Sequence, residues 1–458
     1  MNIKKEYMGY WYLPENKGIE KYGTLVIDDR NNIKLNLCGY FGERTEIFKS
    51  NNINIINGFT KCGKKITLAN CLSGGISINM PGITSAEYIP SYVIIGGEYE
   101  SLDLCMVTEV EADFTGLDKW LNIDSFEFEI NDTDKEYKVY YKLPERRSYS
   151  CEKFDFSIGF GGKINEDKLK SVEITQRTYI EFKFNEEVSL IKSLEYINDF
   201  SRFLTLCLGE EVNQSNIKLK NGESKDISVF WNRMNEEYIS KKKIHEILIP
   251  YNLIEDNFGQ VIQNWYDVKD RLEPIINYII DGYEKVFHIP MTFLKIVQAF
   301  EAFSRKMRKN CKEETIAHEK KIKSILEAIE NTDYKKWLKD TLRYSNEPTL
   351  NSRIKDLYTE LDFFLQLTSR EKKSIANKIS LTRNYYTHFD ESNKKNAMTS
   401  EEIYYSTIIM QLALRVLVMM ELGVDRKLIE SQIINCESYN ISNFKKYFKK
   451  NTSTKSIT

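Results

Sequence analysis

The sequence predicts an α+β protein in which an N-terminal β-rich, sandwich-like domain is followed by an all-α helical bundle. Up to about residue 150, short runs of alternating apolar and polar residues are separated by glycine and asparagine turns, which is typical of strands. Near Asn185 the apolar spacing changes to the helical period, and beyond about residue 256 it stays helical. Strands followed by helices favour the α+β class.

The first strands are predicted from two hairpin patterns. Residues 23–38 hold two alternating runs around a polar turn at residues 28–32, and residues 52–57 and 65–69 flank the segment 58–63 in the same manner. Further strand-like runs follow at residues 92–95, 126–130 and 137–143. This regular spacing favours a sandwich or a curled sheet.

Three aromatic residues are expected to complete the core of this domain or its edge. Trp11, Tyr12 and Trp120 lie beside the predicted strands. Large aromatic side chains more often pack a core than stack on a ligand, although ligand stacking stays an alternative for all three.

The end of the β-rich domain is predicted from a change in composition. Residues 172–184 fit one more strand pair, and residues 188–208 have helical spacing up to Gly209, so this helix could cap the sheet. The polar stretches 213–226 and 240–243 are expected to lead out of the domain. The predicted domains are residues 1–245, a helical bundle of residues 256–440, and a basic tail of residues 441–458 that begins as a short helix and ends disordered.

The helices are predicted from apolar stripes and from helix-end signals. Pro274 should kink or divide a helix at residues 258–283, and Pro290 should open the next one. Helices at residues 314–329 and 352–367 follow, separated by a polar segment around Pro348. The next helix starts near Ser369 or Arg370. The final long helix follows a capping-box pattern at residues 399–402 and stops at Gly423.

Composition excludes several functional classes. The 458 residues include 65 basic and 67 acidic side chains, a net charge of −2, so any nucleic-acid site must be a local patch. The eight cysteines are scattered without a C-x-x-C pair, which argues against structural zinc, and no cofactor is expected. The apolar run 408–420 is short and carries Arg415, so it is expected as a buried helix and not a membrane span. The start lacks the apolar core of a signal peptide, and we expect a cytoplasmic protein.

The strongest candidate for chemistry is the stretch that contains Arg383, Asn384 and His388. Asn384 and His388 are four residues apart and share a helix face, and the long Arg383 side chain can reach the space in front of the imidazole. A guanidinium suits a phosphate, and an imidazole suits proton transfer. Metal-free RNA cleavage needs this combination. In the alternative reading, Arg383 is a solvated helix residue and His388 an ordinary polar group at a helix end.

Other residues are candidates for supporting roles. Glu301 is four residues before Arg305, and it could simply pair with that arginine or hold Arg383 across the bundle. Tyr386, with its neighbours Tyr385 and Phe389, could stack RNA bases, although core packing or a dimer seam would also explain these rings. His318 lies in a charged run and is expected to be solvated.

The arrangement of these motifs resembles a known family. Arg383-Asn384-x3-His388, placed before a last apolar helix, looks like the arginine–x(4–6)–histidine signature of HEPN ribonucleases, and residues 298–305 are similar to an early helix of the ApeA-like HEPN group. The first half resembles the β-rich domain that precedes HEPN in ApeA anti-phage proteins. The residues that carry this likeness are 9–14, 23–25, 63–68 and Trp120.

The chemistry of the Arg383 and His388 side chains suits cleavage of RNA by attack of the 2′-OH, and transfer RNA is one fitting substrate class because its structured loops expose unstacked bases. The resemblance implies an abortive-infection ribonuclease. It also implies a phage-derived trigger received by the N-terminal domain, and a homodimer or higher even oligomer in which two motifs form one cleft. Two alternatives stay open. The HEPN fold could serve as a non-catalytic binding scaffold, or the chain could be the HEPN partner of a nucleotidyltransferase.

Overall fold

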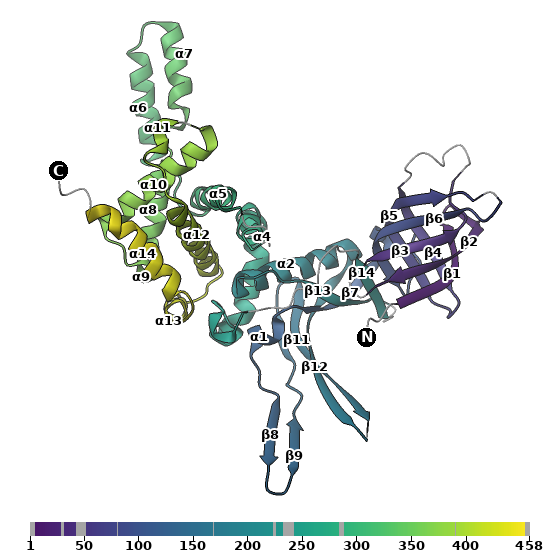
Figure 1. Cartoon of the computed structure of the whole chain (residues 1–458). Helices are drawn as coiled ribbons and strands as arrows, with labels where there is room; N and C mark the ends of the chain where they lie inside the picture. The colour runs from purple at the N-terminus through teal and green to yellow at the C-terminus, as the bar shows by residue number, and fades with distance from the viewer. Residues whose placement is uncertain are drawn as a thin grey trace. The chain divides into compact units, whose positions relative to one another are not determined.

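The computed structural model describes residues 5–28, 32–42, 52–79, 81–167, 169–222, 226–231, 242–283, 288–389 and 391–453, without the side chains of Asn393 and residues 449–453. The chain forms two compact units. The β-rich unit comprises Met1–Thr205 and Val212–Ile244, and the helical unit comprises Leu206–Glu211 and His245–Thr458. The α+β class, with strands first and helices second, is confirmed (Figure 1). The domain boundaries predicted from the sequence stay predictions.

The first six strands close into a barrel. Their pairing runs β1–β2–β3–β6–β5–β4 and returns to β1, so the predicted sheet curls until its edges meet. Both predicted hairpins form. Residues 29–31, which belong to the first predicted turn, lie outside the described residues. The strands are β1 (Lys5–Leu13), β2 (Asn16–Ile27), β3 (Ile33–Cys38), β4 (Ile53–Thr60), β5 (Lys65–Ser77) and β6 (Ser85–Ile95).

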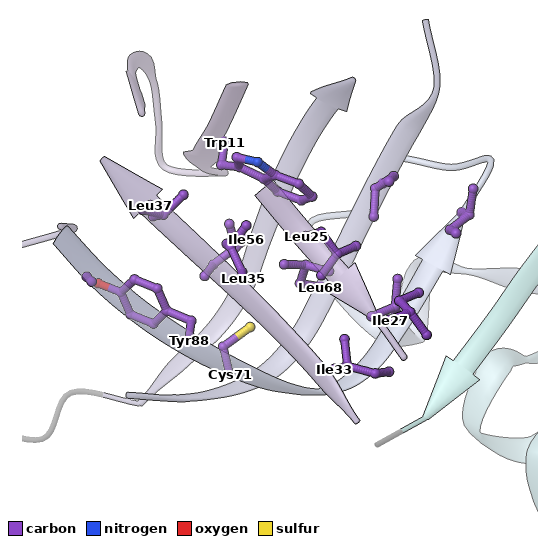
Figure 2. Packing of buried hydrophobic residues seen from close by; sticks show 14 residues of the cluster. Trp11, Leu25, Ile27, Ile33, Leu35, Leu37, Ile56, Leu68, Cys71 and Tyr88 are labelled. Atoms are coloured by element: carbon purple, nitrogen blue, oxygen red, sulfur yellow. The ribbon is translucent and has the colours of Figure 1, made fainter. Parts of the chain in front are cut away.

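The barrel interior is filled by alternate side chains of these strands (Figure 2). Ile33, Leu35 and Leu37 of β3 point inward and are buried, while the residues between them are exposed. Trp11 is fully buried, as predicted, and its indole Nε1 donates a hydrogen bond of 3.2 Å to the carbonyl oxygen of Gly23. A closed barrel leaves no interior strand edge to solvent, which favours a stable scaffold.

The position of Trp11 depends on a glycine of the neighbouring strand. A Cβ atom at Gly58 would lie 2.4 Å from Cε3 of Trp11, so only glycine leaves room for the indole. Gly58→Ala should therefore destabilise the β-rich unit by about 1–3 kcal/mol through overpacking. Urea unfolding followed by tryptophan fluorescence measures this loss. Gly18→Ala is the control, because nothing lies within 4 Å of its Cβ, and an equal shift in both variants would contradict the packing argument.

The remaining strands extend the sheet from β6. The order is β10-β11-β12-β7-β13-β14-β6. Helix α2 (Leu190–Leu208) covers this part, because the Phe200 ring contacts the rings of Phe114, Phe156 and Trp120. Trp120, on α1 (Leu117–Leu121), is fully buried as predicted. The strands are β7 (Met106–Phe114), β10 (Arg147–Ser150), β11 (Phe154–Asp167), β12 (Ser171–Ser189), β13 (Gln214–Lys220) and β14 (Asp226–Trp231), after the short η2 (Leu102–Leu104).

Two predictions about this unit are wrong. Residues 172–184 are not a strand pair but part of the single strand β12, whose partner β11 precedes it. The polar stretch 213–226 does not lead out of the unit, because β13 pairs with β7 and β14 inside the sheet. The other predicted exit is residues 240–243, of which residues 240 and 241 lie outside the described residues.

Tyr12 is half-buried and forms a side-chain hydrogen bond with Glu98. Burial and this hydrogen bond raise the pKa of Tyr12 to about 12.

The helical unit is built around α12 (Ser400–Glu421). Residues 408–420 lie in this helix and are mostly buried, as predicted, and the buried Arg415 donates hydrogen bonds to the carbonyl oxygens of Leu206 and Cys207 at 2.8 and 3.1 Å. Among the described residues, α12 is the single helix with the length and apolar composition to cross a membrane, and 78% of its apolar window is buried inside the protein. The same properties are expected of a core helix.

The other helices surround α12 or extend from it. Pro290 opens α5 as predicted, while Pro274 lies inside α4 without dividing it. The predicted tail begins with a packed helix, α14, whose Phe444 and Phe448 are buried. The helices are η3 (Ile244–Glu246), α3 (Tyr251–Ile254), η4 (Glu255–Asn257), α4 (Phe258–Asp281), α5 (Ile289–Met307), α6 (Thr315–Glu327), α7 (Thr332–Thr341), η5 (Leu342–Tyr344), α8 (Leu350–Glu360), α9 (Asp362–Leu365), α10 (Ser369–His388), α11 (Glu391–Lys394), α13 (Arg426–Cys436) and α14 (Ser438–Ser453).

Helices α6 and α7 form a protruding arm (Figure 1). The sequence predicted this arm only in part, because α7 was not expected.

The prediction that His318 is solvated is wrong. Its Nδ1 lies 2.6 Å from Glu313 Oε1 and its Nε2 lies 2.9 Å from Ser345 Oγ, so the imidazole joins the two ends of the arm. Hydrogen bonding to His318, and then to Lys321, lowers the pKa of Glu313.

Candidate active site in the helical unit

Helix α10 carries the three residues predicted to do chemistry, and both of its ends are specified locally. Thr368 Oγ1 accepts a hydrogen bond from the backbone N–H of Glu371, whose carboxylate accepts one from the N–H of Thr368. The helix ends at His388. Phe389 follows in the left-handed conformation with φ of 50°, and its N–H donates to the Tyr385 carbonyl oxygen at 2.7 Å. The predicted helix start and the position of His388 at a helix C-terminus are confirmed.

Arg383 lies on the half-buried flank of α10 and is held from two sides. Its Nη1 donates a hydrogen bond of 3.0 Å to Asn384 Oδ1, and its Nη2 lies 3.2 Å from Glu301 Oε2. A guanidinium has five N–H donors, so these two contacts leave three of them free to bind a further group. About a third of the Arg383 side chain is exposed, which makes those donors accessible from solvent.

Glu301 of α5 joins two arginines. Its Oε2 contacts Arg383, and its Oε1 accepts hydrogen bonds from Arg305 Nη2 and Nε at 3.1 and 3.3 Å. The two readings left open for this residue therefore describe contacts that occur together. Because one carboxylate fixes the two guanidiniums, the orientation of Arg383 depends on α5 as well as on its own helix.

The charge network continues beyond Arg305. Arg305 Nη1 pairs with Glu347, and Glu347 also lies 3.6 Å from Nη2 of the buried Arg353. Burial opposes the charge of Arg305, but its hydrogen bond to Glu301 and the charge of Glu347 together raise its pKa. Burial and the like charge of Arg305 lower the pKa of Arg353. Three guanidiniums here face two carboxylates, which leaves a local excess of one positive charge. This excess has the sign that a phosphate group requires.

His388 stands apart from this network within one chain. Its side chain is exposed and makes no hydrogen bond or ion pair with another described residue. Tyr386 is half-buried and contacts Tyr385 edge-on, with ring centroids 5.1 Å apart. The structure thus brings Arg383, Asn384, Glu301 and Arg305 together, and places His388 and Tyr386 on the same helix without bonding them to that set.

The end of α10 is tied to the start of α12. Thr382 is fully buried, and its Oγ1 accepts a hydrogen bond of 2.9 Å from the backbone N–H of Met398. Lys378 lies 2.6 Å from the buried Glu402, which completes the predicted capping box with Thr399. These two contacts hold the C-terminal half of α10 against the start of α12.

Glu347 and Arg353 extend the site beyond the residues that were predicted from the sequence. Glu347 lies in the polar segment around Pro348, for which the sequence predicts only a separation between two helices. Arg353 offered a signal, because it lies on the apolar stripe of α8 beside Ile354 and Leu357. A charge within an apolar stripe requires a buried partner. In the part of the chain that the structure describes, no group of three or more His, Cys, Asp or Glu side chains could hold a metal ion.

Two family models match this chain. The model described as ApeA N-terminal domain 1 matches residues 6–265, more than half of the sequence, and the model described as Apea-like HEPN matches residues 294–428. The second match contains Glu301, Arg305, Arg383, Asn384 and His388. The resemblance drawn from the sequence motifs is confirmed in both halves and in their order. No curated protein and no solved structure matches the chain.

Proposed function

The chain belongs to the ApeA family of defence proteins, with an ApeA N-terminal domain before an ApeA-like HEPN domain. We propose that it is an abortive-infection endoribonuclease that cleaves RNA by 2′-OH attack. The observation that supports this most is the guanidinium of Arg383, held by Glu301 and Asn384 with donors to spare, on the helix that presents an exposed His388. These two side chains supply a phosphate clamp and a proton-transfer group.

One histidine cannot act as base and acid at the same moment, so the proposed cleft contains two protomers. One His388 removes the proton from the ribose 2′-OH, and the oxygen attacks the adjacent phosphorus. The bond from phosphorus to the 5′-oxygen then breaks, and the second His388 or a water protonates that oxygen. Arg383 stabilises the charge that develops on the non-bridging oxygens. A two-fold axis supplies both imidazoles from a single gene product.

The proposal specifies the products. Cleavage should leave a 2′,3′-cyclic phosphate on one fragment and a 5′-hydroxyl on the other, should persist in EDTA, and should spare DNA, which lacks the 2′-OH. Incubating the purified full chain with transfer RNA and with unstructured RNA, followed by end analysis of the fragments, tests this. Cleavage that stops in EDTA, or that leaves 5′-phosphate ends, would rule the mechanism out.

The shared cleft has its own test. Arg383→Ala and His388→Ala protomers, each strongly impaired alone, should form mixed dimers that keep one arginine and one histidine. RNA cleavage by the co-expressed pair should exceed that of either variant alone by at least about tenfold, since each lost group contributes more than this. Double-tag purification isolates the mixed species. If the mixture is no more active than its components, each protomer carries a separate site or none.

A non-catalytic scaffold is the second candidate, because Arg383 is already paired within one chain. In that case the ion pair with Glu301 would only fasten α10 to α5. Overexpression separates the two functions: growth arrest by the parent but not by Arg383→Ala supports the nuclease. Arrest of equal strength by both supports the scaffold. Lys373→Ala, which removes an exposed cation from the same helix, is the matched control.

A further inference from the structure

The β-rich unit contains a two-stranded ribbon with one apolar face. In the ribbon of β8 (Phe126–Asn131) and β9 (Glu136–Tyr141), Phe126 is opposite Tyr141, Phe128 opposite Val139, and Ile130 opposite Tyr137. Directly opposed residues share a face, so all six side chains lie on one side. Phe128, Ile130 and Tyr137 are 68%, 66% and 67% exposed. An isolated ribbon is marginally stable in water, and such an apolar face marks a binding surface.

A second ribbon carries a similar face. The outer parts of β11 and β12 extend beyond the sheet, with Ile164 opposite Ile174 and Gly162 opposite Gln176 (Figure 1). Val172 lies two residues before Ile174 and therefore on the same face. Ile164 and Val172 are 64% and 68% exposed. Both ribbons thus present apolar side chains to solvent along one side.

The two faces meet at the base of the ribbons. A Cβ atom at Gly162 would lie 3.1 Å from Cε1 of Tyr141, so the tyrosine ring rests on the side-chain face of Gly162. Since side chains alternate along each strand, the apolar faces of both ribbons are the faces on this shared side. Two polar atoms at the same place, Tyr141 Oη and Gln176 Oε1, are buried and form no hydrogen bond within the described part of the chain.

Charge and backbone decide the kind of partner. Residues 126–141 contain five acidic and two basic side chains, and Glu127, Glu129 and Glu136 occupy the reverse face of the first ribbon. The acidic excess of the first ribbon repels nucleic acid and attracts basic protein segments. Within the described residues, β8 and β9 pair only with each other, so the outer edge of each is open to a further strand. An open edge beside an apolar face suits an extended peptide.

We propose that the two ribbons bind an extended apolar segment of a partner protein whose flanks are basic. The segment lies against the face formed by Phe128, Ile130, Val139, Ile164 and Val172 and pairs with an open strand edge. The binding surface goes beyond the nuclease activity. Its role as the receptor of a phage-derived trigger rests on the proposed function.

A defined peptide tests the surface directly. A fluorescent peptide of alternating valine and threonine with lysines at both ends should bind the full chain saturably in an anisotropy titration. The same peptide with glutamates at both ends should bind at least about tenfold more weakly, as should the lysine peptide to the variant Phe128→Ser/Ile130→Ser/Val139→Thr, because each lost anchor costs more than 1 kcal/mol. Ile19→Ser/Ile83→Ser is the control, since it removes exposed apolar side chains elsewhere in the same unit.

Several outcomes would overturn the assignment. These are a lysine peptide that does not bind, equal binding by the ribbon variant, or a preference for the glutamate peptide. Flotation with phosphatidylcholine–phosphatidylglycerol vesicles that the ribbon variant loses would assign the surface to lipid instead. The titration is repeated with Arg383→Ala, in which peptide binding should persist. Loss of RNA cleavage and loss of peptide binding are therefore separable failures.

Discussion

His388→Ala should reduce RNA cleavage by about 10²- to 10⁴-fold, the usual contribution of a positioned acid–base group. In a two-fold cleft the substitution removes both imidazoles at once, so base and acid are lost together. The fold should be unaffected, because the side chain is exposed and has no bonding partner among the described residues. Single-turnover cleavage in EDTA at saturating protein measures the chemical step without product release.

The matched control is His245→Ala, which removes an exposed histidine outside the bundle helices. It should cleave at the parental rate. A His388→Ala variant that cleaves as fast as the parent would contradict a role of His388 in proton transfer. A loss accompanied by a lower melting temperature would show a structural effect instead of a catalytic one.

The sequence predicted those elements whose structure depends on residues that are close together in the chain. The alternating run of β3 has one buried and one exposed face, and the capping box before α12 bonds backbone groups within a few residues. Such signals depend on neighbours in the chain, and each predicted the element that forms. Gly423, with φ of 87°, ends the last long helix for the same reason.

The missed elements depend on partners that are distant in the chain. β13 alternates lysines with Ile217 and Leu219, and its polar half resembles a linker until Lys218 and Lys220 meet Glu111 and Glu109 of β7. No local pattern reveals a pairing across such separations.

In the candidate site, too, the features that depend on neighbours in the chain were predicted and those that depend on distant partners were not. The spacing of Arg383, Asn384 and His388 on one helix followed from the sequence, because helical geometry fixes it. The contact between Glu301 and Arg383 was only one of two readings, since it joins residues that are 82 positions apart in the chain. Glu347 entered the site without any local signal. Its role depends on Arg305 and Arg353, which come from two other elements.

Glu301→Ala should lower the rate of RNA cleavage by about 10²-fold while leaving substrate affinity nearly unchanged, because misplacing a reacting group by 1 Å has effects of this size. Without this carboxylate, Arg383 loses its contact to α5 and keeps only Asn384. Glu301→Gln should retain part of the activity, since the amide oxygen can still accept one hydrogen bond. The melting temperature should change little, because half-exposed ion pairs contribute at most about 1 kcal/mol.

A double-mutant cycle separates positioning from a simple structural contribution. If Glu301 acts through Arg383, then Glu301→Ala should cost nothing further in an Arg383→Ala background, because the group that it orients is already gone. An independent role for Glu301 would instead make the two losses multiply. Arg305→Ala provides the internal comparison. It removes the other guanidinium bound to Glu301, so it should free this carboxylate to bind Arg383 alone and reduce cleavage less than Glu301→Ala does.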